Sequence, residues 1–326
     1  MTSRTATLGG SAALMITATC FGLPAVSAAD FPTKPLRLLV GFAPGGGADI
    51  VARLLGPKLT EVLGQQVIVD NRPGAGGNIA TALLAKAEPD GHTLMLGSLG
   101  QLAINPTLYG SLPFDVSRDL APVTRVTDAT NILCLNPTVS VTDVRELIAV
   151  SKTRSLNAGS SGIGSVAHLA LELFNSMAGT KIVHVPYKSG GQAMVELVAG
   201  EVQVVFSNPA AAMAQVKAGR VKALAVTTAK RLDLMPELPT VAESGVPGFE
   251  ANNWVGLVVP ARTPRSRIDR LNADVRAILG ASELRKLLYG LALEAHPSTP
   301  EEFADYIRSE TLKWSQVVKS SGAKPE

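Results

Sequence analysis

Three glycine-rich segments, each between an apolar run and a helical stretch, are the residues of this sequence best suited to hold a ligand. They are Gly41–Asp49, Asn157–Ser165 and Tyr187–Gln192. Glycine lets the backbone approach a bound group closely, and the first turn of a helix leaves its N–H groups without partners. These N–H groups and the helix dipole favour an anion, at roughly 0.3–1 kcal/mol for each contact. Several such helix starts facing one cleft would form a receptor for a small carboxylate.

The candidate ligand contacts lie in these segments or at the ends of neighbouring apolar runs. Phe42 and Trp254 offer apolar walls or a stacking surface, and hydroxyl groups offer further donors. The expected ligand-binding residues are Phe42, Ala43, Pro44, Gly45, Gly46, Gly47, Ala48, Asp49, Ser98, Ser160, Ser161, Gly162, Gly164, Ser165, Tyr187, Ser207, Asn208 and Trp254. We expect no catalytic residue, no metal site and no cofactor.

Structural roles compete with ligand binding at several of these positions. Gly45–Gly47 also suits a tight turn from strand to helix, and Asp49 fits the first-turn acid of a helix better than a ligand contact. The serines of the second segment can cap the helix predicted over 166–177.

The same choice arises for polar residues near these segments. Arg72 can hold a carboxylate bidentately, yet Asn71–Asn78 also suits the ordering of its own loop. His168 pairs at i+4 with Glu172 on the polar side of its helix, which predicts a place at the surface or between lobes. His184 lies in an apolar strand and is expected to be structural.

The N-terminus has the layout of a secretory signal peptide. Arg4 precedes the uncharged stretch Thr5–Ala29, which ends in the small residues Ser27–Ala29. The stretch is marginal in length for a membrane span and is broken by Gly22 and Pro24. We therefore predict that residues 1–29 are removed near Ala29 and that the mature protein lies outside the cytoplasm.

Composition and motifs exclude several functional classes. The net charge is only +3 and no run of Lys or Arg forms a patch, which argues against nucleic-acid binding. Cys134 would be the one cysteine left after cleavage, so neither a disulfide nor a cysteine metal site is expected. The hydrophobic fraction of 46% is ample for one large domain or two lobes.

An enzyme is the rival class, and its motifs are weak here. Gly162–Ala167 matches a loose dinucleotide fingerprint, but the next apolar strand, 182–185, has no acid at its end to hold a ribose. Gly159–Gly162 lacks the five-residue spacing of a nucleophile elbow. The sequence also has no His-x-x-x-His or Cys-x-x-Cys pair for a metal. We therefore expect a protein that is not an enzyme.

Strand and helix patterns alternate along the chain, which predicts an α/β fold with a parallel sheet and helices on both faces. The N-terminal part reads as strands at 36–41, 66–70 and 93–97 and helices at 49–63 and 78–87. Further strands are expected at 131–135, 182–185, 202–206, 221–227 and 253–259, helices at 141–151, 166–177 and 210–218, and an irregular connection at 232–248. Helix starts are expected at Thr263-Pro264 and at Thr299-Pro300, the latter with a capping box to Glu302.

A series of short blocks closely resembles the Bug-type extracytoplasmic solute receptors of tripartite tricarboxylate transporters. The resemblance runs in order over essentially the whole mature chain. Its blocks are Phe31–Arg37, Val40–Asp49, Val69–Asn78, Glu88–Thr93, Ile104–Pro106, Val183–Lys188, Ala218–Arg220, Pro239–Glu243 and Pro247–Glu250.

This resemblance implies a two-lobed periplasmic binding protein, type II-like, that closes on its ligand like a flytrap, each lobe a mainly parallel sheet flanked by helices. The chain would cross between lobes near Ala129–Leu135 and Phe249–Gly256. Lobe one would hold residues 30–130 and 252–326, and lobe two residues 131–251. We expect the protein to be a monomer.

The resemblance also implies a small organic acid as ligand and the membrane permease subunits of such a transporter as partners. A sensor that docks on a membrane signalling protein needs the same cleft and stays open as an alternative. Many family members carry an acid after the strand that matches 202–206, where this sequence has Ser207-Asn208. If that acid reads a ligand amine, its absence favours a carboxylate without an amine.

Overall fold

The computed structural model describes residues 1–2 and 31–325, and the chain divides between Asp30 and Phe31. Apart from Met1 and Thr2, the signal peptide predicted for residues 1–29 lies outside the described residues. The fold described below is that of the unit from Phe31 onward. Within the described residues, the helices are too short or too polar to cross a membrane.

The first sheet, sheet A, has six strands in the order β11-β4-β10-β3-β1-β2. They are β1 (Leu36–Val40), β2 (Val67–Asn71), β3 (Thr93–Ser98), β4 (Leu120–Ala129), β10 (Asn253–Pro260) and β11 (Leu293–Ala295). Strands β2, β1 and β3 pair in parallel, whereas β10 is antiparallel to both β3 and β4, and β11 is antiparallel to β4. Four of these six strands therefore point the same way.

The second sheet, sheet B, has five strands in the order β7-β6-β8-β5-β9. They are β5 (Ile132–Leu135), β6 (Asn157–Ser160), β7 (Val183–Pro186), β8 (Val204–Ser207) and β9 (Lys222–Val226). Strands β7, β6 and β8 pair in parallel, and β5 runs antiparallel to β8 and β9. Each sheet is thus mixed in pairing but mainly parallel in direction.

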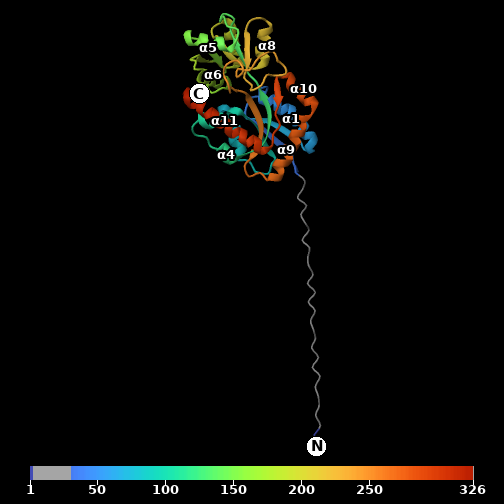
Figure 1. Ribbon diagram of the computed structural model, residues 1–326. Helices are drawn as coiled ribbons and strands as arrows, with labels where there is room; N and C mark the ends of the chain where they lie inside the picture. Colours follow the sequence, from blue (N-terminus) through green and yellow to red (C-terminus); the bar gives the residue numbers. More distant parts are fainter. Residues whose placement is uncertain (3–30, 326) are drawn as a thin grey trace. The chain divides into compact units, whose positions relative to one another are not determined.

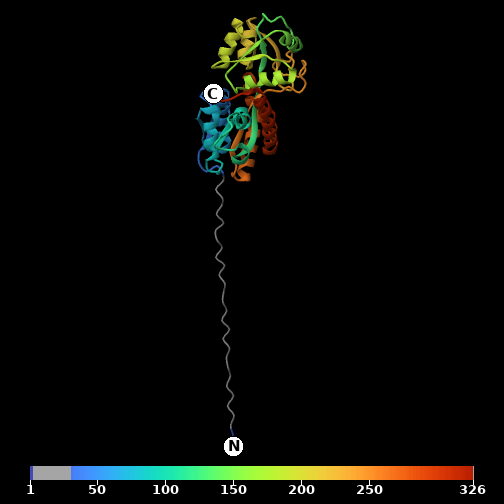
Figure 2. The same ribbon diagram turned by 90° about the vertical axis from the view of Figure 1, so that its left-hand side faces the viewer.

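Helices flank both faces of each sheet (Figures 1 and 2). On sheet A, alternate residues of β1 point to opposite faces. Leu36, Leu38 and Val40 belong to the core that includes α1 (Gly47–Leu63), α9 (Arg265–Gly280) and α10 (Ser282–Gly290), while Leu39 belongs to the core that includes α2 (Asn78–Ala85) and α11 (Pro300–Ser321). The helices are α1 (Gly47–Leu63), α2 (Asn78–Ala85), α3 (Asn105–Leu108), α4 (Val116–Asp119), α5 (Val144–Thr153), α6 (Val166–Ala178), α7 (Gly190–Ala199), α8 (Pro209–Lys217), α9 (Arg265–Gly280), α10 (Ser282–Gly290) and α11 (Pro300–Ser321), with the short turns η1 (Ala75–Gly77) and η2 (Gly100–Ile104).

The helix starts test two sequence predictions. Helix α11 begins with the predicted capping box, because the Thr299 side chain accepts from the Glu302 N–H and the Glu302 side chain accepts from the Thr299 N–H. The predicted start at Thr263 is wrong by one residue, since Pro264 is the N-cap of α9 and makes no side-chain cap. Residues 157–160, which belong to the second glycine-rich segment and were not among the predicted strands, form strand β6.

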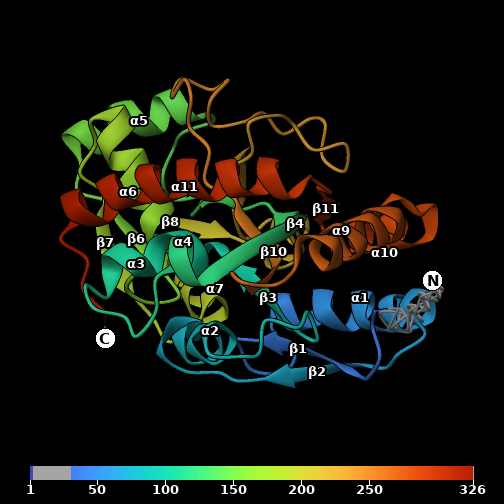
Figure 3. The ribbon, with the colours of Figure 1, turned by 90° about the horizontal axis from the view of Figure 1, so that it is seen from below.

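Long helix α11 connects the two halves of the core. It contacts β4, η2 and α3 on the side of sheet A, and it also contacts α6, which packs on sheet B (Figure 3). Its buried residues Phe303, Ile307 and Trp314 share one core cluster with residues of sheet B such as Leu133.

The chain passes between the sheets twice, and both passages are bonded to Thr227. The first passage follows β4 through Asn131, and the second enters β10 through Ala251 and Asn252. Thr227 is fully buried; its N–H donates to the Asn131 carbonyl at 2.9 Å, and its carbonyl accepts from the Ala251 N–H at 3.0 Å. The predicted lobe boundaries, 131–251 against the rest, stay a prediction.

Candidate functional site

The predicted ligand segments follow the carboxyl ends of parallel strands. In sheet A, β1 leads into Gly41–Gly46 and β3 ends at Ser98. In sheet B, β6, β7 and β8 end at Ser160, Pro186 and Ser207. This is the edge at which open α/β sheets bind ligands, because helices begin there with unpaired N–H groups.

The first segment is held in shape by Asp49. The carboxylate of Asp49 is 1% exposed and accepts hydrogen bonds from the Gly45 N–H at 2.9 Å, Arg53 Nε at 2.8 Å and Asn71 Nδ2 at 2.9 Å. The bond from Arg53 outweighs burial and, with those from Gly45 and Asn71, lowers the pKa of Asp49 to about 2. Asn71 Nδ2 also donates to the Phe42 carbonyl at 3.0 Å. Asp49 therefore orders its loop, the structural alternative that the sequence favoured.

The backbone of the first segment keeps free donors. Helix α1 has Gly46 as N-cap without a side-chain cap, and Ile50 is the first residue whose N–H bonds back to it. Within residues 31–325, the N–H groups of Gly47, Ala48 and Asp49 have no acceptor. They are the groups available to an anion at this helix start.

Gln101 is a site residue that sequence analysis missed. It is fully buried, donates from Nε2 to the Gly77 carbonyl at 3.1 Å and to Thr81 Oγ1 at 3.2 Å, and accepts from the N–H and the hydroxyl of Ser98, both at 3.1 Å. Gln101 therefore connects the end of β3 to the start of α2. The hydroxyl of Ser98, a predicted ligand contact, donates its proton to Gln101. A lone glutamine inside the apolar stretch Leu99–Ile104 was the signal in the sequence.

Gly41 shows how tightly this region is packed, and it gives a matched test. A Cβ at Gly41 would lie 2.5 Å from Gln101 Nε2 and 2.9 Å from Gly77 Cα, whereas a Cβ at Gly47 would meet nothing within 4 Å. Gly41→Ala is expected to cost about 1–3 kcal/mol of unfolding free energy through overpacking. Gly47→Ala should leave stability unchanged or raise it by up to about 1 kcal/mol. Urea denaturation of both variants measures the difference, and equal costs would contradict this packing.

The segment between β2 and α2 is also occupied by internal bonds. Arg72 Nε bonds Asp70 at 2.9 Å, and Asn105 Nδ2 donates to the Gly76 carbonyl at 3.0 Å and to Asn78 Oδ1 at 2.8 Å. Asn78 Nδ2 is buried and has no acceptor within the described part of the chain. The side-chain N–H group of Asn78 is therefore available as a hydrogen-bond donor beside the first segment.

The second segment contains β6 and continues to the start of α6, where a serine caps the helix. Ser165 is the N-cap of α6 and accepts from the His168 N–H at 3.2 Å. The N–H groups of Val166 and Ala167 have no acceptor among residues 31–325. A Cβ at Gly164 would lie 2.5 Å from Leu108 Cδ2. This segment, which continues from sheet B, therefore contacts α3, the helix that follows β3 of sheet A in the chain.

His168 corrects a prediction. The residue is 5% exposed and stacks on His184 with 3.8 Å between ring centroids. The pairing with Glu172 at i+4 is present, with Nε2 and Oε1 3.7 Å apart. Of the two places predicted for His168, the surface is wrong because the residue is buried, and a place between the lobes stays a prediction.

The third segment and the end of β8 provide two more helix starts. Ser189 caps α7 by accepting from the Gln192 N–H at 3.2 Å, and Asn208 caps α8 by accepting from the Ala211 N–H at 2.9 Å. Tyr187 packs its ring against Gly159, where a Cβ would lie 3.2 Å away. Ser207 is buried opposite Ile132.

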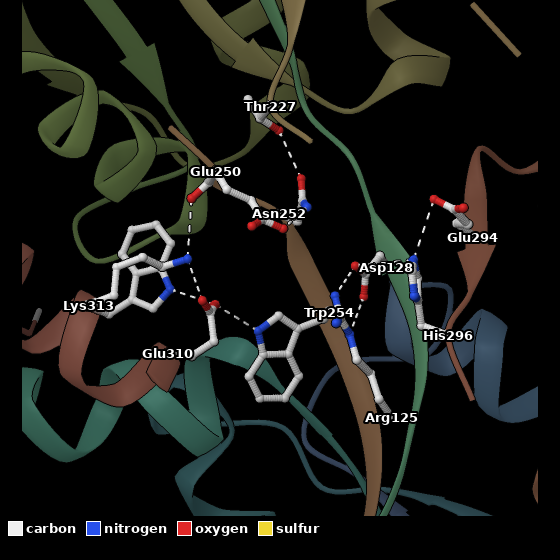
Figure 4. A network of polar contacts seen from close by, with 11 residues as sticks. Arg125, Asp128, Thr227, Glu250, Asn252, Trp254, Glu294, His296, Glu310 and Lys313 are labelled. Carbon is white, nitrogen blue, oxygen red and sulfur yellow. Dashed lines mark hydrogen bonds and ion pairs between the residues drawn. The ribbon is translucent and has the colours of Figure 1, made fainter. Parts of the chain in front are cut away.

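Trp254 is the clearest correction among the predicted contacts. Its side chain is 1% exposed, donates from Nε1 to Glu310 Oε2 at 3.0 Å and packs edge-on against Phe303 and Tyr306. Figure 4 shows the bond from the Trp254 indole to Glu310 of α11. Because the ring is almost fully buried, it belongs to the core and does not offer a stacking surface to a ligand.

A buried polar network surrounds Trp254 where the second passage enters β10 (Figure 4). Glu310 also accepts from Trp314 Nε1 at 3.0 Å and pairs with Lys313, which in turn donates to the Glu250 carbonyl at 3.3 Å. The network ties α11 to this passage.

A second part of the network lies on β4. Arg125 pairs with buried Asp128 and lies 3.8 Å from the centre of the Tyr306 ring. Burial raises the pKa of Asp128 and that of Tyr306.

A cavity of about 620 Å³ lies elsewhere, between α4, α11 and the strands β4 and β10. Its walls are mainly apolar, with Leu102, Phe114, Val258 and Ile307 among them, and no predicted ligand contact lines it. Within the described residues there is no cluster of three or more His, Cys, Asp or Glu side chains placed to bind a metal.

Comparison with known proteins decides the family. The family described as TctC, the tripartite tricarboxylate transporter family receptor, matches residues 51–323. The chain belongs to this family. The receptor is 36% identical over 306 residues to protein BugT of Bordetella pertussis, an alignment that covers 92% of this chain and 93% of BugT.

Two solved structures extend the comparison. The receptor is 36% identical to Rpa4515 of R. palustris, solved with adipate, with a TM-score of 0.78 over 91% of this chain and 100% of that chain. It is 32% identical to MatC of Rhodopseudomonas palustris, solved with bound malate, with a TM-score of 0.73 over 88% of this chain and 100% of that chain. The receptor thus has the two-lobed α/β fold of periplasmic binding proteins that the resemblance implied.

Proposed function

We propose that this receptor captures a small organic carboxylate in the periplasm, between a lobe built on sheet A and a lobe built on sheet B, and delivers it to a tripartite tricarboxylate-type membrane permease. One observation carries the proposal: helices from both sheets begin at the carboxyl ends of parallel strands, and their first backbone N–H groups have no acceptor within residues 31–325. They are Gly47, Ala48 and Asp49 on α1, Val166 and Ala167 on α6, and Gly190 and Gly191 on α7.

Contacts between the sheets support a shared binding space. Gly164 of the second segment touches Leu108 of α3, and Asn105 of α3 bonds the Gly76–Asn78 turn beside the first segment. Closure of lobes 30–130 plus 252–326 and 131–251 would then bring the helix starts to one carboxylate. Neutral donors hold an anion without a permanent counter-charge, which permits its release.

The ligand class follows from the donors and from the relatives. Structures of relatives hold adipate and malate, both dicarboxylates. At the end of β8 this chain has Ser207 and Asn208, and the side-chain oxygen of Asn208 caps α8 by accepting from the Ala211 N–H. With no carboxylate there to pair with an amine, we expect adipate or malate to bind more tightly than aspartate or glutamate.

Thermal unfolding of residues 30–326 with a panel of acids tests the proposal. The panel holds adipate, malate, succinate, citrate, aspartate, glutamate, benzoate and nicotinate. A ligand at 100 times its Kd adds about 2.7 kcal/mol, a shift of several degrees for a chain of this length. Refolding after denaturation removes any acid carried over from the expression host. No shift with any acid after refolding would contradict the proposal, and tight binding of aspartate or glutamate would contradict the preference.

A further inference from the structure

Two stacked histidines lie beside the second glycine-rich segment. His168 on α6 and His184 on β7 have ring centroids 3.8 Å apart and ring planes 17° apart. His168 is buried and His184 is half-buried.

Each imidazole bonds one end of the segment. The Gly164 N–H donates to Nδ1 of His168 at 3.0 Å. Ser160 Oγ lies 2.6 Å from Nε2 of His184, accepts from the Gly162 N–H at 3.1 Å and donates to the Gly162 carbonyl at 3.0 Å. Which partner donates in the bond between Ser160 and His184 depends on the tautomer of His184, and in either tautomer this bond joins β7 to the Ser160 end of the segment.

The bond from the Gly164 N–H requires a neutral His168 ring. Nδ1 of His168 accepts a hydrogen bond only when it carries no proton, so the proton lies on Nε2, toward Glu172. Burial lowers the pKa of His168 to about 4, and burial followed by the charge of His168 lowers that of His184 to about 4. The two rings and Glu172 face one another; β6, β8 and α11, which also pack on α6, bring no further ion pair to either ring within residues 31–325.

We propose that His168 and His184 are positioning residues, a neutral pair that fixes Ser160–Ser165 in the shape in which α6 presents its first N–H groups to the carboxylate. The role rests on the proposed function of this segment. His168 holds the Gly164 end and His184 holds the Ser160 end, so the N-cap Ser165 and the free donors of Val166 and Ala167 keep one orientation. A preordered loop avoids an ordering cost on binding.

Substitution of His168 tests the proposal. His168→Asn keeps an acceptor at the δ position, whereas His168→Leu fills the space without one. Without ligand, loss of one bond of about 1 kcal/mol should speed hydrogen exchange of the Gly164 amide about five- to tenfold in the leucine variant. The asparagine variant should stay within about threefold of the wild type. Affinity for adipate should fall about tenfold with leucine and recover with asparagine, while the exchange of core amides such as Leu133 stays unchanged.

A second pair makes the test independent of one variant's folding. His184→Gln keeps an amide near the ε position that can donate or accept a hydrogen bond, whereas His184→Leu has neither group, and the Gly162 amide reports the difference. Wild-type exchange at Gly164 in His168→Leu, or equal loss of adipate affinity in the asparagine and leucine variants, would overturn the proposal. A wild-type protein that binds no acid of the panel would overturn the proposed function, while the exchange rates would still decide the role of the histidines.

Discussion

An Asp49→Ala variant is expected to lose about 2–4 kcal/mol of unfolding free energy and at least about tenfold in affinity for its carboxylate. Removal of the carboxylate leaves the Gly45 N–H, the Asn71 amide and the Arg53 guanidinium without their acceptor. The loop before α1 then loses the bonds that orient its free N–H groups. Urea denaturation measures the first effect, and calorimetric titration with adipate measures the second.

Arg53→Ala is the matched control for Asp49→Ala. The Arg53 side chain is 55% exposed and its loss leaves Asp49 the bonds from Gly45 and Asn71, so Arg53→Ala should cost less than half as much unfolding free energy as Asp49→Ala. Acid gives a further check, because the Asp49 pKa is lowered from 3.8 to about 2. The contribution of Asp49 is therefore present above pH 3.8 and lost as pH falls toward 2, and Asp49→Ala should lack this part of the acid transition. If both variants were equally stable, the buried carboxylate would not be what orders this loop.

A Glu310→Ala variant is expected to lose about 3–5 kcal/mol of unfolding free energy. Two buried indole N–H groups, those of Trp254 and Trp314, donate to the same oxygen of Glu310, and both would be left unpaired in the core. Because these are the two tryptophans of the chain, intrinsic fluorescence reports directly on the change. Denaturation followed by this signal measures the loss.

Two substitutions on the same helix separate the causes. Glu310→Gln keeps an oxygen for the indoles and loses the ion pair with Lys313, so it should cost less than half as much as alanine. Leu312→Ala removes a side chain that is 70% exposed and should change stability by less than about 0.5 kcal/mol. If glutamine cost as much as alanine, the ion pair and not the indole bonds would stabilise this network.

Sequence patterns correctly predicted those helices and strands that are determined by residues close together in the chain. The capping box at Thr299 is specified by residues within one turn, and α1 follows its glycine segment as the periodicity indicated. Strand β4 was missed because Thr124, Arg125 and Asp128 interrupt its apolar pattern. These polar residues find partners on distant elements, such as Ser298 and Tyr306, which no local window contains.

The candidate site was likewise predictable only where its residues are close together in the sequence. The glycine segments could be located from sequence because strand, turn and helix are adjacent in the chain. Trp254 was misassigned because its partner Glu310 lies 56 residues away on α11. The surface position predicted as one alternative for His168 was wrong because its ring stacks on His184 of β7, a contact that the helical spacing alone does not reveal. Gln101 acts through segments 20 and 24 residues distant, so its role appears only once the loops are folded together.

Thr227 has a mechanical consequence for any closure of the lobes. Because the two passages between the sheets are both bonded to this one residue, they form a narrow ribbon instead of two separate tethers. A hydrogen-bonded ribbon bends easily across its flat face and resists shear and relative sliding of its strands. The lobes of such a receptor would then have one soft direction, opening and closing, while rotation about the long axis would be stiff. The ligand would be met by the same donors at every closure.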